Sequence, residues 1–371
     1  MKVGLNATCF NERSSGAKQR FKGIYSALIH RLPNAEFLLY EPADCPVGHW
    51  FSEADNVTAL RTPIPSNGRL RKAVYGSVYW HSVFTAERFD LFECFNEPLI
   101  DCPTARNLTT IHDLRRLYSD YLSPERHLYS LSLRSTLAKV DHVITVSESM
   151  KSEMHSYYPD ARISVVYNGL DCNRFSAFGD VECEGVRKKY CLPHEFLLSV
   201  GHFERRKNYL RLLDAIALVH DRGTDCHLVI IGNDSGERRH VEERMHALNL
   251  SSCVTLLSGL SDLEVRCIYK ISSLFVFPSS YEGFGIPILE AMASGVAPVL
   301  SDIPVFREIT ENRGVYFPHH DVEAMAESIA LMLGSREKRE ELITYGHQRV
   351  QEFSFDKLAS QLANLYSSFI L

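Results

Sequence analysis

Two glutamates, Glu282 and Glu290, flank a glycine-rich turn in the second half of the chain. The turn follows a short apolar run of the kind that fills a strand buried on both faces. Gly283 and Gly285 allow backbone conformations that are closed to other residues, and Pro287 favours the first turn of a helix. Because helix starts present unpaired N–H groups and the positive end of a dipole, this strand, turn and helix start suit an oxygen-rich or anionic ligand.

The two carboxylates have different predicted surroundings. Glu282 lies in the turn, whereas Glu290 falls about one turn inside the helix, among apolar neighbours where a carboxylate is costly unless it has partners. A structural interpretation is equally open, since single carboxylates near helix starts are common and benefit from the helix dipole. The residues alone leave ligand binding and a structural role as alternatives.

A basic cluster follows another predicted strand. The apolar run at 196–200 leads into Gly201 and then into Arg205, Arg206 and Lys207. Ligands of parallel sheets bind beyond the carboxyl ends of the strands, so these cations are placed to meet an anion. A run of charges is more often part of a solvated surface, and composition alone favours that alternative.

The first half of the chain holds two further candidates. His112 and Asp113 directly follow a predicted strand at 107–111, and Gly16 lies between a first strand at 3–5 and a helix at 20–31. A Rossmann-like fold receives its ligand at such positions. The alternative for His112 and Asp113 is a structural hydrogen-bonded pair, and the alternative for Gly16 is an ordinary strand-to-helix turn.

The elements that position these residues alternate along the whole chain, which indicates parallel sheets covered by helices. Predicted strands lie at 3–5, 36–40, 89–92, 107–111, 142–146, 163–167, 196–200, 227–231, 254–257, 273–277 and 296–300. Ser261 and Glu264 have the spacing of a capping box, which predicts a helix start. A chain of 371 residues exceeds what one hydrophobic core usually serves, so we expect two domains, joined by a polar, irregular linker at 172–194.

Composition excludes several classes of protein. The chain is 45% apolar and 23% charged, and its net charge of -6 argues against nucleic-acid binding. None of the ten cysteines has C-x-x-C spacing, which favours buried thiols in a reducing compartment. The start of the chain predicts a strand rather than a signal peptide, and no apolar run approaches the roughly 20 residues of a spanning helix. We therefore expect a cytoplasmic protein.

Three segments carry a family resemblance. The run from Pro278 reads P-S-x-x-E-G-F-G-x-P-x-L-E-A-M-A, residues 110–114 read T-x-H-D-L, and residues 200–208 read V-G-x-x-E-x-R-K-N. They resemble segments of retaining glycosyltransferases of family 4, especially bacterial mannosyltransferase-like members. The resemblance implies an α/β fold with two Rossmann-like domains facing each other across a cleft, the GT-B architecture. It also implies an acceptor-binding domain at 1–171, a nucleotide-sugar-binding domain at 195–352, and a terminal helix at 353–371 that packs back on the first domain.

The same resemblance implies roles for the candidate residues. Arg206 and Lys207 would hold the donor diphosphate, and Glu282 and the neighbouring loop amides would hold sugar hydroxyls. Glu290 would bind the ribose, and His112 would contact the sugar. The implied catalytic residues are His112, Arg206, Lys207 and Glu282. The implied donor-binding residues are Gly16, Gly201, Arg206, Lys207, Gly283, Phe284, Gly285, Ile286 and Glu290.

Substrates and partners are also implied by the resemblance. The donor would be a nucleotide sugar, GDP-mannose or a GDP-linked deoxy relative, with no other cofactor. The acceptor would be a saccharide or a lipid-linked saccharide in bacterial surface polysaccharide or lipopolysaccharide assembly. Basic spots at 69–72 and 115–116 suit a lipid diphosphate or an anionic membrane surface, hence peripheral contact with the inner membrane. Solvated surface is an equally open interpretation of these spots. No two aspartates are two positions apart, as in the D-x-D pair of metal-dependent transferases, so we expect transfer without a metal ion.

Other functions are less well matched. A nucleotide-dependent oxidoreductase should show G-x-G-x-x-G after a strand, and neither half of the chain has it. A sugar-binding protein with two hinged domains normally carries a secretion signal. An epimerase or a phosphorylase of the same architecture is the nearest alternative.

Overall fold

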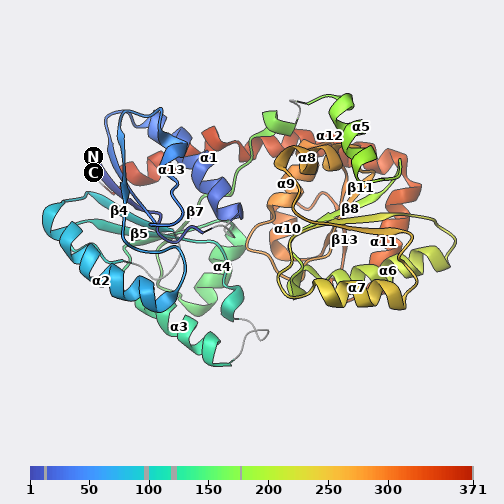
Figure 1. The fold of residues 1–371 in the computed structure, drawn as a ribbon, viewed down its shortest axis with the longest axis horizontal. Helices are drawn as coiled ribbons and strands as arrows, with labels where there is room; N and C mark the ends of the chain where they lie inside the picture. The colour runs from blue at the N-terminus through green and yellow to red at the C-terminus, as the bar shows by residue number, and fades with distance from the viewer. Residues whose placement is uncertain (12–14, 96–99, 118–122, 176–177, 370–371) are drawn as a thin grey trace. The chain divides into compact units, whose positions relative to one another are not determined.

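Short apolar runs build two parallel sheets, one in each of the two units into which the chain divides. The computed structural model describes all residues except 12–14, 96–99, 118–122, 176–177 and 370–371. The first unit contains Met1–Gly169 and Phe353–Leu371, and the second contains Leu170–Glu352 (Figure 1). The chain therefore leaves the first unit, completes the second and returns to the first.

The sheet of the first unit has seven strands in the order β3-β2-β1-β4-β5-β6-β7. All described pairings are parallel, and the sequence order reverses at β1, which lies between β2 and β4. The strands are β1 (Lys2–Asn6), β2 (Glu36–Glu41), β3 (Val57–Arg61), β4 (Leu91–Phe95), β5 (Arg106–Ile111), β6 (His142–Thr145) and β7 (Ile163–Val165). In open sheets of this kind, ligands bind at the carboxyl ends of the strands near the reversal.

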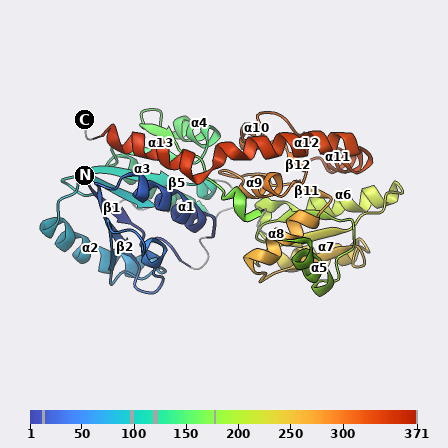
Figure 2. The same ribbon diagram turned by 90° about the horizontal axis from the view of Figure 1, so that it is seen from above.

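Helices cover both faces of this sheet. The helices are α1 (Ser15–Arg31), α2 (Arg69–Ala86), α3 (Ser123–Leu137), α4 (Glu148–Tyr157) and α13 (Phe355–Ser367). α1 and α13 share one apolar core with the sheet, whereas α2, α3 and α4 pack on its other face (Figure 1). α13 lies directly beside α1 (Figure 2), and a Cβ added at Gly23 would overlap the ring of Phe355. The two helices are thus as close as a glycine allows.

The sheet of the second unit has six strands in the order β10-β9-β8-β11-β12-β13. The strands are β8 (Leu197–Val200), β9 (Leu228–Ile231), β10 (Val254–Leu257), β11 (Leu274–Phe277), β12 (Pro298–Ser301) and β13 (Val315–Phe317). The helices are α5 (Asp180–Lys189), α6 (Tyr209–Asp221), α7 (Arg238–Ala247), α8 (Asp262–Ile271), α9 (Ile286–Ala293), α10 (Pro304–Ile309), α11 (Val322–Gly334) and α12 (Arg336–Arg349). α6, α7 and α11 pack on one face. On the other face, Tyr269 of α8 meets Phe275 and Phe306 of α10 stacks on Phe277.

The α/β class with two parallel sheets is confirmed, and so is the helix start at the capping box of Ser261 and Glu264. Three local predictions differ from the structure. The stretch at 172–194 is not an irregular linker, because it contains α5, which packs on α8 in the second unit. α1 begins at Ser15 rather than at 20, so Gly16 lies in its first turn. β3 and β13 were not predicted from the sequence.

None of the described helices is both long enough and apolar enough to cross a membrane.

Candidate functional site

Two loops of the second unit are joined at the carboxyl ends of β8 and β11, which are neighbours in the sheet. The loop after β8 contains a short 3₁₀ turn, Arg205–Lys207, and the loop after β11 precedes α9. The backbone N–H of Ser280 donates to the carbonyl oxygen of Arg206 at 2.8 Å. Asn208, in the left-handed conformation with φ of 60°, donates from Nδ2 to the carbonyl oxygen of Pro278 at 3.1 Å. These bonds fix the basic cluster against the loop that carries Glu282.

Glu282 lies between two cations. Its Oε1 is 2.6 Å from Lys207 Nζ, and its Oε2 is 2.6 Å from Arg206 Nη1. The side chains of Lys207 and Glu282 are only 7% and 11% exposed, so water screens these pairs little. Burial alone would raise the pKa of Glu282, but the charges of Arg206 and Lys207 outweigh it and lower the pKa to about 2. The three predicted residues therefore form one ionised cluster.

Lys207 is held from several sides. Burial lowers the pKa of its ammonium group, and the charge of Glu282 counteracts this. Nζ also lies 4.6 Å from the centre of the Phe277 ring, a cation–π contact. A Cβ added at Gly201 would come within 2.8 Å of Lys207 Cε. Gly201 thus serves Lys207 by leaving space for its side chain.

Glu204 is a member of this cluster that sequence reasoning missed. Its Oε2 accepts a hydrogen bond from Arg206 Nε at 2.8 Å, so Arg206 bridges two carboxylates. Arg206 Nη1 also donates to the carbonyl oxygen of Tyr281 at 3.2 Å. The only sequence signal for Glu204 was its place in the run V-G-x-x-E-x-R-K-N, and no role was assigned to this glutamate. Two cations and two carboxylates leave the cluster nearly neutral.

The start of α9 holds the second predicted carboxylate. Gly285, with φ of 135°, precedes the helix, and Pro287 occupies its first turn as predicted. Glu290 accepts a hydrogen bond from Tyr269 Oη at 2.9 Å, and burial raises the pKa of Glu290 to about 7. No local pattern pointed to Tyr269, because its pairing with Glu290 joins two helices. Gly283, Phe284 and Ile286 lie in the loop and first turn around these residues, and Phe284 is buried.

The remaining predicted residues, His112 and Gly16, belong to the first unit. His112 directly follows β5, and burial together with the charge of Arg20 lowers the pKa of His112 to about 3. Its imidazole is therefore neutral at physiological pH. Arg20 is itself buried on α1 and donates from Nη1 to the carbonyl oxygen of Tyr167 at 2.6 Å. Sequence reasoning assigned nothing to Arg20.

A buried carboxylate of the first unit, Glu93 on β4, was also missed. Thr110 Oγ1 donates to it at 2.7 Å, and Tyr366 Oη on α13 donates to its other oxygen. Burial raises the pKa of Glu93, and these donors counteract it. Glu93 therefore ties the terminal helix to the sheet.

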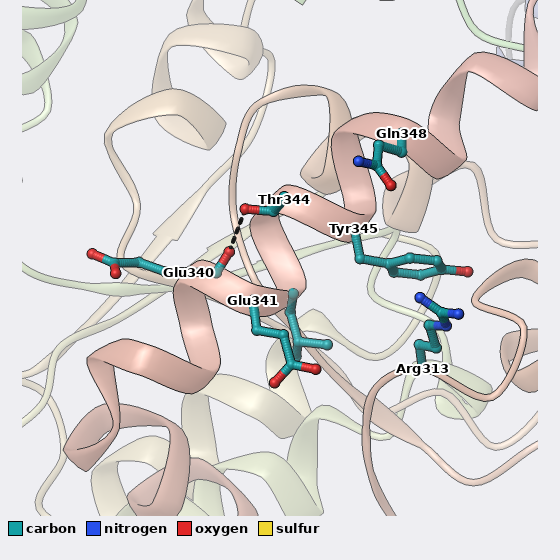
Figure 3. Close-up of a pocket in the computed structure, with 7 residues that line it drawn as sticks. Arg313, Glu340, Glu341, Thr344, Tyr345 and Gln348 are labelled. Carbon is teal, nitrogen blue, oxygen red and sulfur yellow. Dashed lines mark hydrogen bonds between the residues drawn. The ribbon is translucent and has the colours of Figure 1, made fainter.

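A groove on α12 lies apart from the predicted residues. It encloses about 400 Å³, and the residues lining it are Arg313, Glu340, Glu341, Leu342, Thr344, Tyr345 and Gln348. The guanidinium of Arg313 lies 4.9 Å from the centre of the Tyr345 ring (Figure 3). Tyr345 Oη donates to the carbonyl oxygen of Thr310, which anchors α12. None of the predicted site residues lines this groove.

Comparison with known proteins identifies the family. Residues 189–349 match the model for glycosyl transferases group 1, and residues 36–174 match that for glycosyltransferase family 4. The O-antigen chain mannosyltransferase RfbU of Salmonella typhimurium is 27% identical over 304 residues, 80% of each chain. The O-antigen chain mannosyltransferase B of Escherichia coli is 28% identical over 270 residues, 70% of each chain.

Solved structures agree on the fold. Sucrose-phosphate synthase from Thermosynechococcus elongatus has a TM-score of 0.76 at 18% identity, and the match covers 100% of this chain and 99% of that one. WaaG, a glycosyltransferase involved in lipopolysaccharide biosynthesis, has a TM-score of 0.72 at 17% identity and covers 99% and 100%. These comparisons do not favour the alternative of an epimerase or a phosphorylase. Two family models that together span most of the chain, and the mannosyltransferase relatives, establish that the protein is a hexosyltransferase of glycosyltransferase family 4, and the solved structures show that its fold is the GT-B architecture.

Proposed function

We propose that the protein transfers mannose or a related deoxyhexose from a GDP-linked donor to a saccharide or lipid-linked saccharide, with retention of the anomeric configuration. The cluster of Arg206, Lys207 and Glu282 at the ends of β8 and β11 carries this proposal. Two relatives named as O-antigen chain mannosyltransferases support the sugar and a role in bacterial surface polysaccharide assembly.

The proposed catalysis rests on stabilising the departing nucleoside diphosphate. Arg206 can form a forked pair with phosphate oxygens, Lys207 adds a point charge, and the amides at the start of α9 add oriented donors. While no donor is bound, Glu282 pairs with both cations, and together with Glu204 it balances their charge. A donor diphosphate takes over part of that role, which leaves Glu282 oxygens to accept hydrogen bonds from sugar hydroxyls.

His112 and Glu290 have supporting roles in this proposal. Since its pKa is about 3, His112 acts as a neutral hydrogen-bonding group toward the sugar and not as a cation. Glu290, beside Tyr269, accepts from the ribose hydroxyls. Gly16, in the first turn of α1, leaves room for the donor to approach that helix start.

We place the reaction in the cytoplasm, with peripheral contact at the inner membrane where a lipid-linked acceptor resides. All ten cysteines are free thiols, which suits a reducing compartment. No cofactor beyond the nucleotide sugar is required by the proposed chemistry.

Incubation with a panel of nucleotide sugars in excess EDTA tests the proposed function. We expect GDP release from GDP-mannose or a GDP-deoxyhexose at full rate, because protein cations supply the charge that a metal ion supplies elsewhere. The same panel should show little release from UDP-sugars. If UDP-sugars alone are turned over, the proposed donor is wrong. If EDTA abolishes release and magnesium or manganese restores it, the metal-free mechanism is wrong.

Replacing Glu290 by glutamine should have opposite effects on binding and stability. Loss of the carboxylate weakens nucleoside diphosphate binding by roughly 1.5–3 kcal/mol, the scale of a hydrogen bond to a charged group. The pKa of Glu290 is raised in the folded state, so the folded protein binds its proton more tightly than the unfolded chain does. The native stability therefore falls as pH rises from the unfolded pKa, about 4.5, to about 7, and stays lower above that. Glu290→Gln should remove this loss.

Calorimetry with GDP and thermal unfolding at pH 5 and pH 8 measure both effects. We expect the substitution to stabilise the free protein by about 1–3 kcal/mol more at pH 8 than at pH 5. Glu327→Gln, a change on α11 away from the predicted residues, is the matched control and should alter neither quantity. Unchanged GDP affinity in a folded Glu290→Gln protein would contradict the ribose assignment.

A further inference from the structure

The outward face of α2 carries a group of exposed apolar side chains, although a helix that packs on a sheet usually has a polar outer face. Val74 is 60% exposed, Tyr75 is 52% exposed and Val78 is 75% exposed. Residues three and four positions apart are neighbours on a helix, so these three side chains form one patch. The opposite face carries Trp80, only 4% exposed, which packs in the core. The patch is therefore not needed to hold α2 on the sheet.

The charges of α2 are of one sign. Its 18 residues include no aspartate or glutamate, and its first turn contains Arg69, Arg71 and Lys72. Arg71 is exposed and lies one turn before Val74 and Tyr75. The ammonium group of Lys72 is turned inward, toward the carbonyl oxygen of Thr8 at 3.4 Å. The apolar patch thus has a basic border at its N-terminal end.

α3 adds to the same layer of the first unit. Leu128 is 60% exposed and Leu131 is 64% exposed, and Arg134, one turn later, is also exposed. α2 and α3 cover the same face of the sheet (Figure 1). Of the ten large apolar residues exposed in the described part of the chain, five lie on these two helices. Exposed apolar surface is therefore concentrated on one side of this unit.

We propose that α2 docks on an anionic lipid bilayer, with the patch of Val74, Tyr75 and Val78 buried at headgroup depth and Arg71 on lipid phosphates. An apolar stripe bordered by arginine and lysine is the pattern of a helix that lies in a membrane interface. With a net charge of -6, the protein as a whole is repelled by an anionic surface, so approach requires a region without carboxylates. α2 is such a region. Docking would bring the enzyme to the surface that holds the proposed lipid-linked acceptor. This purpose of docking rests on the proposed function, whereas the docking itself does not.

Co-sedimentation with vesicles of phosphatidylcholine and phosphatidylglycerol in equal amounts tests the docking face. The native chain should bind at low salt and bind pure phosphatidylcholine vesicles weakly. The triple variant Val74→Ser, Tyr75→Ser, Val78→Ser should lose more than about tenfold in partition coefficient, and Arg71→Ala about fivefold. Val181→Ser is the matched control, because Val181 is 84% exposed on α5 in the other unit and should not affect binding.

Insertion depth gives a second, independent measurement. A Val78→Trp side chain should be quenched by lipids with brominated chains, above the background of native Trp50 and Trp80, whereas Val181→Trp should not. Binding that survives the triple substitution, or no binding by the native chain, overturns the proposal. A dimer that the triple variant converts to monomer, without lipid binding, makes the patch a contact between copies and also overturns it. GDP release in solution needs no vesicles, so it should be normal in the triple variant and tests the transfer reaction separately.

Discussion

Replacing Lys207 by methionine should lower turnover by about a hundredfold or more, the scale on which enzymes lose rate when a group that stabilises developing charge is removed. Methionine is apolar and of similar length, so it fills the space between Gly201 and the Phe277 ring. Glu282 keeps its pairing with Arg206, which limits the cost of a buried charge left without a partner. Steady-state rates of GDP release measure the effect.

The matched control is Lys338→Met on α12, where the native lysine is exposed. It should keep the native rate. Thermal unfolding of Lys207→Met distinguishes lost catalysis from lost structure. A folded Lys207→Met protein with nearly native turnover would rule out the assigned role of this lysine.

Replacing Gly232 by alanine should both destabilise the second unit and impair the site. An added Cβ would overlap the carbonyl oxygen of Gly201 and lie 2.8 Å from its carbonyl carbon. Both contacts are with backbone, so no side chain can rotate away, and the ends of β8 and β9 must separate. Overpacking of this kind costs about 3 kcal/mol. Because Lys207 packs on Gly201, displacement of the loop should also lower turnover by about a hundredfold, as small misplacements in active sites do.

Urea unfolding and GDP release measure these two losses. Gly185→Ala on α5 is the control in the same unit, since nothing lies within 4 Å of a Cβ added there. In a helix, alanine is favoured over glycine by about 1 kcal/mol, so this change should be neutral or stabilising. Equal stability of the Gly232→Ala and native proteins would contradict the close approach of the two strand ends.

Much of the fold could be predicted because strands buried on both faces are read directly as apolar runs. β11 and β9 are examples, and their positions were predicted to within a residue. β3 was missed since it lies at the edge of its sheet and most of its side chains are exposed, so Val57–Arg61 lacks the apolar pattern. α5 was missed since its sequence is largely polar and only Cys183 and Val186 are buried.

The candidate site shows a different limit. Arg206, Lys207 and Glu282 were each singled out from local motifs, but nothing in the sequence showed that residues 75 positions apart form one ion cluster. The pairings of Glu290 with Tyr269 and of Glu93 with Tyr366 likewise depend on how distant elements pack. Glu93 did have a signal, a carboxylate within an apolar strand, but its partner lies on a helix 273 positions away. Short segments show which residues could take part in chemistry, whereas the packing of distant elements decides which of these residues form pairs.

The return of α13 to the first unit has a consequence for protein synthesis. During translation, the strands of Met1–Gly169 emerge first, but Leu358 and Leu362, which complete their core, follow only after the whole second unit. Until then, one face of the nascent sheet lacks its cover beside α1, and Glu93 lacks the hydroxyl of Tyr366. The second unit is continuous in sequence and can fold on the ribosome as soon as it emerges. The second unit can therefore complete its fold before the first unit does, although the first unit is synthesised earlier.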